Sequence, residues 1–461
     1  MNHPSPPPAP PLTFRGGLLG ALAPMVVFLA GVTALAALGA PDERGFWPVL
    51  VTAWMLGIAL AHDREAWSEA AITAVAQPIV VVMILAWLLA GVFGAILAEA
   101  GLVGSLVHVA GIAGVGPIGI VGVAFLTCAA ISTATGTSFG TLLVAGPVLY
   151  AAGGALGADG PVLMGAVLAG ATWGDSISPI SDTSIASAGS QSTDVAGTVR
   201  ARLQYVVPAG LIALAASLLW ASRRPVTTPP PLAASEVGAA TGVVMLLAPM
   251  LVIRMLLRRR PLLEGLLAGI GVAVTLGLVT GHLRAGALLH VEPSAFGARG
   301  VLVDGLGRGV GVSVFTILLM GLVGTLHAST ALTQLLARVH GAAATPRRAE
   351  WLIVGLVSGA VVLTTHSVVA ILAVGPVVSR LGTFAGVSAY RRANLLDLTV
   401  CTWPFLLPWF LPTILAASTT AGGAFPPLTP LAVGLHNTYA WALLITVPLA
   451  VWTGYGRRSE G

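Results

Sequence analysis

The stretch GATWGDSISPISDTSIASA, residues 170–188, places two aspartates, Asp175 and Asp182, among hydroxyl residues directly after an apolar run. A carboxylate within the hydrocarbon layer is costly, so an intramembrane aspartate by default marks an ion path or a proton relay. A spacing of seven residues (182 − 175) would place both on one face of a continuous helix. Because Pro179 lies between them, the sequence predicts instead a broken helix with one carboxylate on each side of an unwound turn.

The oxygen atoms of this stretch suit a small hard cation. Asp175, Asp182 and Ser178 are the candidate Na⁺ ligands, and Ser181 and Thr183 add hydroxyl oxygens. Burial favours the protonated form of a carboxylate, and a cation that binds the same oxygens displaces the proton, which couples the two flows. The alternatives are that Asp182 caps a helix that begins near Thr183 and that Asp175 lies at an exposed segment end.

Further polar residues interrupt other apolar runs. The break STATGTSFG, residues 132–140, contributes the candidates Thr135, Thr137 and Ser138, although small hydroxyl residues are also common where membrane helices pack. His366 either carries a proton or donates to a carbonyl. Asp397 is either a second intramembrane carboxylate or a residue at a helix start.

The composition indicates the elements that must position these residues. The chain is 56% hydrophobic and 8% charged, whereas soluble domains carry about 25% charged residues. Apolar runs such as 16–40, 78–98 and 262–280 approach the length of about 20 residues that spans a bilayer as a helix. The sequence therefore predicts an all-α polytopic protein with about 11–13 transmembrane segments, in the plasma membrane or cell inner membrane.

The net charge of +5 does not indicate a nucleic-acid partner. All 22 basic residues are arginines, and they cluster in short breaks between apolar runs, which is typical of topology-setting charge. Arginines placed outside the membrane favour a cation over an organic anion as the substrate. Cys128 and Cys401 lie in apolar surroundings, so no disulfide framework is expected.

Two pairs of segments repeat at nearly one offset. LLAGVFGAILAEAGLVGSLVHV from Leu88 resembles LLMGLVGTLHASTALTQLLARV from Leu318 (318 − 88 = 230). GTSFGTLLVAGPV, residues 136–148, resembles THSVVAILAVGPV, residues 365–377, with Pro147 matching Pro376 (376 − 147 = 229). Duplicated halves with helices broken at corresponding points are the architecture of secondary transporters. We therefore expect two inverted repeats with broken helices. Glu99 and His327, within the first pair, are weaker candidate polar groups.

The predicted organisation follows from these segments. It comprises a disordered Pro-rich N-terminus (1–15), N-terminal membrane segments (16–75), a first repeat (76–221), a linker (222–236), middle membrane segments with a polar loop (237–307), a second repeat (308–453) and a C-terminal tail (454–461).

GATWGDSISPISDTS resembles the signature of the NhaC family of Na⁺/H⁺ antiporters, with Gly-Asp at 174–175 and Ser-Pro-x-Ser-Asp-Thr at 178–183. TATGTSFGT, residues 133–141, and LLDLTV…WPFLLPW, residues 395–409, are similar to further family segments. The resemblance implies an inverted-repeat transporter with Na⁺ and H⁺ as substrates. The chain departs from the family at Thr365–Ser367, where Gly-Asp/Asn-Gln is usual, and it lacks the acid beside Asp397. These departures bear on the substrate, since relatives also move malate and lactate.

The predicted function is therefore secondary active transport by Na⁺/H⁺ antiport, with no cofactor and with Na⁺ as a transported ion. The alternative is a Na⁺- or H⁺-coupled transporter of organic anions or amino acids. The expected partners are Na⁺, H⁺ and the lipid bilayer, and a homodimer remains open. An intramembrane aspartyl protease is excluded because Thr172 replaces the first glycine of Gly-x-Gly-Asp and no Tyr-Asp pair occurs. A channel would need neither paired broken helices nor a titrating carboxylate pair. We expect no enzyme activity.

Overall fold

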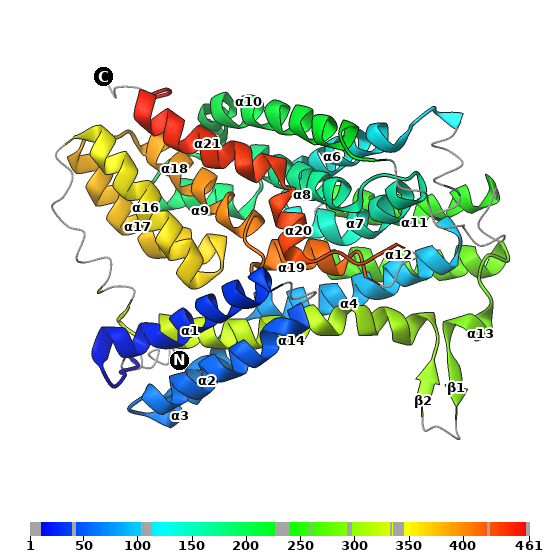
Figure 1. Cartoon of the computed structure of the whole chain (residues 1–461), viewed down its shortest axis with the longest axis horizontal. Coiled ribbons are helices and arrows are strands. Elements are labelled where there is room, and N and C mark those ends of the chain that lie inside the picture. Colours follow the sequence, from blue (N-terminus) through cyan, green and yellow to red (C-terminus); the bar gives the residue numbers. More distant parts are fainter. Residues whose placement is uncertain are drawn as a thin grey trace, which may run out of the picture.

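The computed structural model describes residues 11–38, 43–102, 105, 112–225, 240–258, 260–292, 297–331, 334, 345–421 and 425–457. Within these ranges the chain is almost entirely helical (Figure 1). A small antiparallel hairpin, β1 (His290–Glu292) and β2 (Gly297–Arg299), projects from one end. Eight of the described helices are long and apolar enough to cross a membrane, and three shorter ones are also apolar. The predicted all-α polytopic class is confirmed.

The N-terminal helices pack on one long central helix, α14. They are α1 (Gly17–Ala37), a 3₁₀ turn (Glu43–Phe46), α2 (Trp47–Leu60) and α3 (Arg64–Val75), and α14 spans Val301–His327. The Trp54 indole on α2 donates to the Leu318 carbonyl of α14 at 2.7 Å. Residues 11–15, predicted within the disordered N-terminus, instead pair with the chain: the Leu12 amide donates to the Ala328 carbonyl at 2.8 Å.

Helix α4 (Pro78–Glu99) lies side by side with α14 (Figure 1). Glycines bring the two backbones together: a Cβ at Gly305 would lie 2.6 Å from the Val92 Cα, and one at Gly309 would lie 2.8 Å from the Trp87 carbonyl oxygen. Small residues permit this close approach of membrane helices, whose association depends on packing because lipid tails are themselves apolar.

Two sets of helices follow α4 and α14. The first set is α6 (Pro117–Thr135), α7 (Ser138–Ala155), α8 (Gly160–Ile177), α9 (Asp182–Ser190) and α10 (Val195–Ser222). The second is α16 (Pro346–Thr364), α17 (Ser367–Phe384), α18 (Ala389–Val400), a 3₁₀ turn (Trp403–Phe405), α19 (Leu411–Ser418), α20 (Pro430–Leu435) and α21 (Thr438–Thr453). Between the sets lie a 3₁₀ turn (Ala240–Leu246), α11 (Leu247–Leu257), α12 (Leu262–Val279) and α13 (Ala285–Leu288).

The helix bounds repeat at an offset of 229 residues, the offset found for the second pair of sequence segments. Helix α16 begins and ends 229 residues after α6 (346 − 117 and 364 − 135), and α17 does so after α7 (367 − 138 and 384 − 155). Helix α18 begins 229 residues after α8 (389 − 160). The inverted orientation of the halves stays a prediction. Most of the predicted linker, from residue 226 on, and the later part of the first repeat match lie outside the described residues.

A short helix of each set packs against helices of the other set. Helix α9 packs against α17 and α18 of the second set, and α19 packs against α7 and α8 of the first. The long helices α10 and α21 run side by side along one face (Figure 1). The broken regions of each set are therefore enclosed by helices of the other.

Candidate functional site

The first break separates α6 from α7. Gly136 ends α6 in the left-handed region with φ 71°, which glycine adopts without steric penalty. Thr137 then caps α7, and its hydroxyl accepts from the Gly140 amide at 3.2 Å. The hydroxyl run predicted to interrupt this segment is thus the junction between two helices.

The second break separates α8 from α9, as Pro179 predicted. Helix α8 ends at Ile177, and the Ser178 amide donates to the Asp175 carbonyl at 3.2 Å. Pro179 has no amide hydrogen and disfavours helical backbone in the residue before it. Ser181 is the N-terminal cap residue of α9, which begins at Asp182.

The two breaks touch each other. A Cβ at Gly136 would lie 2.7 Å from the Ile180 carbonyl oxygen, so the first break packs against the backbone of the second. One turn earlier, a Cβ at Gly174 would lie 2.7 Å from the Ser132 Cβ. Glycine on each helix therefore brings the end of α6 and the end of α8 into direct contact.

Asp175 lies at this junction, in the last turn of α8. Its residue is 8% exposed, and its Oδ2 accepts from the Ser138 hydroxyl at 3.0 Å. The other oxygen, Oδ1, is buried and has no hydrogen-bond partner among the described residues, and the same holds for the Ser132 hydroxyl. Two buried oxygens near the break are therefore left with unused lone pairs, which a proton or a cation would satisfy.

Asp182 is placed differently from Asp175. It is the first residue of α9, and its side chain is exposed. The Ser181 and Thr183 hydroxyls pair with each other at 3.1 Å, and the buried Ser178 Oγ accepts from the Ile180 amide at 3.4 Å. Of the predicted Na⁺ ligands, only Asp175 is thus a buried acid, and a shared role with Asp182 and Ser178 stays a prediction.

The break between α16 and α17 repeats the first one. Thr365 ends α16 with φ 52°, at the position that matches Gly136 (365 − 136 = 229), and His366 precedes α17. The Ser367 hydroxyl, which matches Ser138, donates to the Val400 carbonyl at the end of α18 at 3.2 Å. In both halves this serine thus holds the end of the third helix, but only in the first half does it meet a carboxylate. His366 is half-buried, and its Nδ1 has no described partner.

Asp397 lies in the last turn of α18, and its side chain forms a fully buried ion pair with Arg202 of α10. The placement of all arginines outside the apolar helices was therefore wrong. Arg202 lies two turns inside α10, and Arg391 and Arg392 are buried on α18. Burial is possible because each of these guanidinium groups has hydrogen-bond partners: Arg391 binds Glu350 and the Tyr205 hydroxyl, and Arg392 binds Gln191.

Arg202 and its hydrogen-bond partners were not among the candidates from the sequence. Its guanidinium donates to the Ser176 carbonyl at 3.0 Å, to the Ser184 hydroxyl at 2.8 Å and to the Asn394 side-chain oxygen at 3.1 Å. The available signal was Asp194, whose side chain caps α10 and thereby places Arg202 inside the helix.

The remaining candidates have local roles in the structure. The Thr135 hydroxyl donates to the Ile131 carbonyl of its own helix at 2.8 Å, and Glu99 and His327 are the last residues of α4 and α14. Cys128 and Cys401 are both buried and unpaired, as expected.

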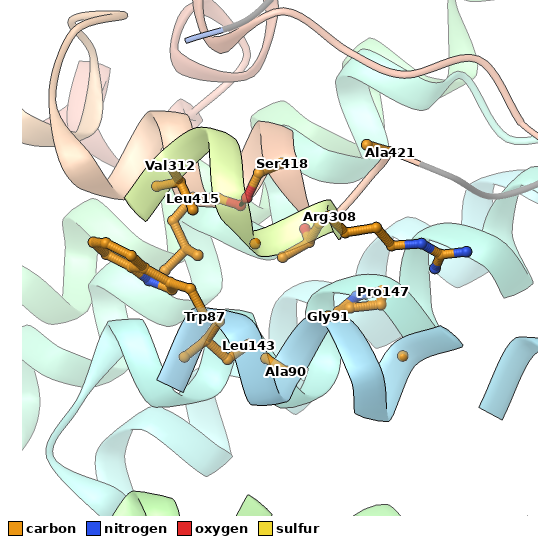
Figure 2. Close-up of a pocket in the computed structure, with 13 residues that line it drawn as sticks. Trp87, Ala90, Gly91, Leu143, Pro147, Arg308, Val312, Leu415, Ser418 and Ala421 are labelled. Atoms are coloured by element: carbon orange, nitrogen blue, oxygen red, sulfur yellow. Dashed lines mark hydrogen bonds between the residues drawn. The ribbon is translucent and has the colours of Figure 1, made fainter. Parts of the chain in front are cut away.

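A pocket lies between α4, α7, α14 and α19, apart from Asp175. Figure 2 shows the Trp87 ring at one end and the Arg308 guanidinium at the other. The walls are apolar or small, and Ser418, the last residue of α19, and Thr419, which follows it, contribute hydroxyl groups that donate to carbonyls of α19.

The site is made by a segment that matches a known family. Residues 49–220, which hold both breaks of the first half, match the model of the Na⁺/H⁺ antiporter family. The resemblance found in the motif around Asp175 is thereby confirmed for this part of the chain.

Three curated antiporters are similar to the chain over short stretches. The malate-2H⁺/Na⁺-lactate antiporter of Bacillus subtilis is 41% identical over 87 residues, 19% of each chain. The Na⁺/H⁺ antiporter NhaC of Alkalihalophilus pseudofirmus is 36% identical over 94 residues, 20% of each. The arginine/ornithine antiporter ArcD of Halobacterium salinarum is 34% identical over 99 residues, 22% of this chain and 20% of its own. The match thus spans about a fifth of each relative's length.

One of the solved structures that align over most of the chain's length is a transporter. It is the YdaH transporter of Alcanivorax borkumensis, with a TM-score of 0.38 and 13% identity, over 95% of this chain and 98% of the other.

Proposed function

We propose that this multi-pass membrane protein is a secondary active transporter that exchanges Na⁺ for protons at the Asp175 carboxylate. The observation that carries the proposal is the buried Oδ1 of Asp175, which has no described partner at the junction of two helix breaks. The family of residues 49–220 and the Na⁺/H⁺ antiporter among the relatives support it. The plasma membrane or cell inner membrane is the proposed location, where Na⁺ and proton gradients are maintained.

The chemistry requires one carboxylate and no cofactor. A buried carboxylate is unstable as a bare charge, so it binds either a proton or a cation. Ser138 holds one oxygen and leaves the other free for the exchanged ion. Ser132 is a further candidate ligand, because its hydroxyl is unpaired and it contacts Gly174, the neighbour of Asp175. Because proton and Na⁺ compete for the same oxygen, each displaces the other.

The test uses purified protein in vesicles with a Na⁺ gradient and an internal pH dye. We expect Na⁺-driven proton flux, and Asp175→Asn should lower its rate by at least about 100-fold, because the amide neither ionises nor binds the cation as a charge. The matched control is Glu264→Gln, the same change on α12 at an exposed acid, which should transport normally. Absence of flux in the wild type, or wild-type flux in Asp175→Asn, would refute the proposal.

A second candidate is transport of a small organic anion. The pocket with Arg308 favours this candidate, and so do the buried arginines within the helices. One of the similar antiporters is named for malate and lactate, which are organic anions. The discriminating measurement is uptake of radiolabelled lactate or malate into the same vesicles. Uptake that is lost in Arg308→Gln, with Asp175-dependent proton flux seen only when the anion is present, would favour this candidate.

A further inference from the structure

Arg202 is enclosed by both halves of the protein. It lies on α10 with 0% of its residue exposed, and it contacts the end of α8, the helix α9 and the helix α18. A guanidinium group keeps its charge at every accessible pH, so this position holds a permanent positive charge. Such a charge is tolerated in the protein interior only with a compensating partner.

That partner is Asp397. The Arg202 Nη1 pairs with the Asp397 Oδ2, and the two side chains are 0% and 1% exposed. Asn394, one turn earlier on α18, accepts from the Arg202 Nε at 3.1 Å and fixes the orientation of the guanidinium plane. The pair is neutral as a unit, so Asp397 does not contribute a net charge to the region around the breaks.

Asp175 has no such partner. Among the described residues no arginine pairs with it, and its Oδ2 accepts a hydrogen bond from the Ser138 hydroxyl. The Arg202–Asp397 pair lies next to Asp175, because the Arg202 Nη1 donates to the carbonyl of Ser176, the residue that follows Asp175, at 3.0 Å. Of the two buried acids beside the breaks, one is therefore compensated and the other is not.

Among the other charged groups, Asp182 also acts electrostatically on Asp175. Asp182 is exposed on α9, and Glu350 is paired with Arg391 and Arg457 at the far ends of α16 and α18. Arg392 donates to the Gln191 side chain at 2.9 Å, away from Asp175. His366 precedes α17, where its Nδ1 contacts no described acid.

We propose that Arg202 is a built-in counter-ion that keeps the ion site at one net negative charge, so that one Na⁺ exchanges for one proton. This inference rests on the proposed function and adds its stoichiometry and the residue that sets it. With Na⁺ or with a proton bound, the site is neutral, so the exchange cycle moves no net charge across the membrane. Two bare carboxylates would instead retain a charge after binding one ion and would favour a second proton or a divalent cation.

The first experiment measures the balance point of the wild type. Vesicles receive a fixed tenfold Na⁺ gradient, and the pH difference at which proton flux stops is determined at several membrane potentials set with K⁺ and valinomycin. For one-to-one exchange the flux stops at a pH difference of about one unit, whatever the potential. A balance point that moves with the potential overturns the inference but leaves Na⁺/H⁺ exchange standing, whereas a wild type without any Na⁺-driven flux overturns the proposed function.

The second experiment removes the counter-ion. Arg202→Gln leaves the charge of Asp397 without a counter-ion beside Asp175. The pH difference at which proton flux stops in this variant should therefore depend on the membrane potential. The matched control is Arg391→Gln, which also removes a buried arginine from a carboxylate partner but lies away from the breaks, and its balance point should stay independent of potential. A folded Arg202→Gln protein that balances like the wild type contradicts the inference.

A third variant covers the case in which Arg202→Gln does not fold, because an unpaired buried carboxylate is strongly destabilising. Arg202→Gln with Asp397→Asn removes both charges together, so the site again holds only the charge of Asp175. We expect this double variant to exchange with a balance point independent of potential. A double variant that exchanges with a potential-dependent balance point overturns the inference.

Discussion

At the scale of single residues, the hydrogen bond from Ser138 to Asp175 defines the proposed site. It joins the first residue of α7 to the last turn of α8 over 3.0 Å. The matching serine of the second half donates to a backbone carbonyl instead. The same position of the repeat thus contacts a carboxylate in the first half and a backbone carbonyl in the second. The two halves therefore differ in their chemistry at this position.

Ser138→Ala should weaken Na⁺ binding. The hydroxyl stabilises the charged carboxylate, and a hydrogen bond to a charged group contributes about 1.5–3 kcal/mol. The Na⁺ concentration for half-maximal exchange at fixed pH should therefore rise by about tenfold or more, with a smaller effect on the maximal rate. Initial rates in vesicles over a series of Na⁺ concentrations measure this.

The control for Ser138→Ala is Thr141→Ala, on the same helix. The Thr141 hydroxyl is also buried, but it donates to the Thr137 carbonyl of its own helix at 2.9 Å. It should leave the half-maximal Na⁺ concentration unchanged. Equal Na⁺ dependence of Ser138→Ala and the wild type would show that the hydroxyl does not act on the site.

At the scale of elements, the function depends on where helices end. The ends of α6 and α8 are specified locally, by Gly136 and by Pro179, yet the two ends meet in space. Their contact creates a place where a carboxylate is buried beside interrupted backbone. A continuous α8 would carry Asp175 as one more residue of a packed helix.

Gly136→Ala should destabilise the protein more than Gly101→Ala. Both glycines have positive φ, 71° and 74°, so alanine is strained at either position by about 1–2 kcal/mol. At Gly136 the new Cβ would meet backbone, lying 2.7 Å from the Ile180 carbonyl oxygen, whereas at Gly101 no atom of the described residues lies within 4 Å of the added Cβ. The overlap should add about 1–3 kcal/mol.

Thermal unfolding in detergent measures the two glycine variants against the wild type. A lower midpoint for Gly136→Ala than for Gly101→Ala is the expected order. Equal unfolding midpoints for the two variants would mean that the two breaks are not in contact in solution.

At the scale of the whole molecule, α4 and α14 form the contact that joins the N-terminal helices to the two repeated sets. Helix α14 packs on α2 and α3 on one side and on α4 and α19 on the other. Its glycines allow α4 to approach closely, and the pocket of Figure 2 lies beside this crossing.

Gly309→Ala should separate these helices, and Gly307→Ala should not. At Gly309 a Cβ would lie 2.8–2.9 Å from the backbone of Trp87 and Leu88, while at Gly307 the part of the chain that the structure describes has no atom within 4 Å of the added Cβ. We expect Gly309→Ala to cost about 1–3 kcal/mol of stability through overlap. Gly307→Ala should be neutral or stabilise by up to about 1 kcal/mol, because alanine favours helix. The unfolding midpoints of both variants check this, and a destabilising Gly307→Ala would contradict the packing described for α14.

The membrane helices and the positions where they end can be predicted from the sequence alone. Its apolar runs predict membrane helices because a chain in lipid must bond its backbone internally, and Pro179 ended α8 because proline has no amide to donate. The repeated motifs located corresponding helix breaks, with Gly136 and Thr365 at matching positions, because local residues set where helices end.

Only the tertiary structure decided which charges meet. Asp175 and Asp182 are close in sequence, yet one is buried and the other exposed, because α8 and α9 present different faces to their neighbours. Arg202 and Asp397 are far apart in sequence and form one ion pair, because α10 of the first set packs against α18 of the second. Local patterns fix helix ends, but the pairing of buried charges depends on which helices lie side by side, and that arises from the packing of the whole chain.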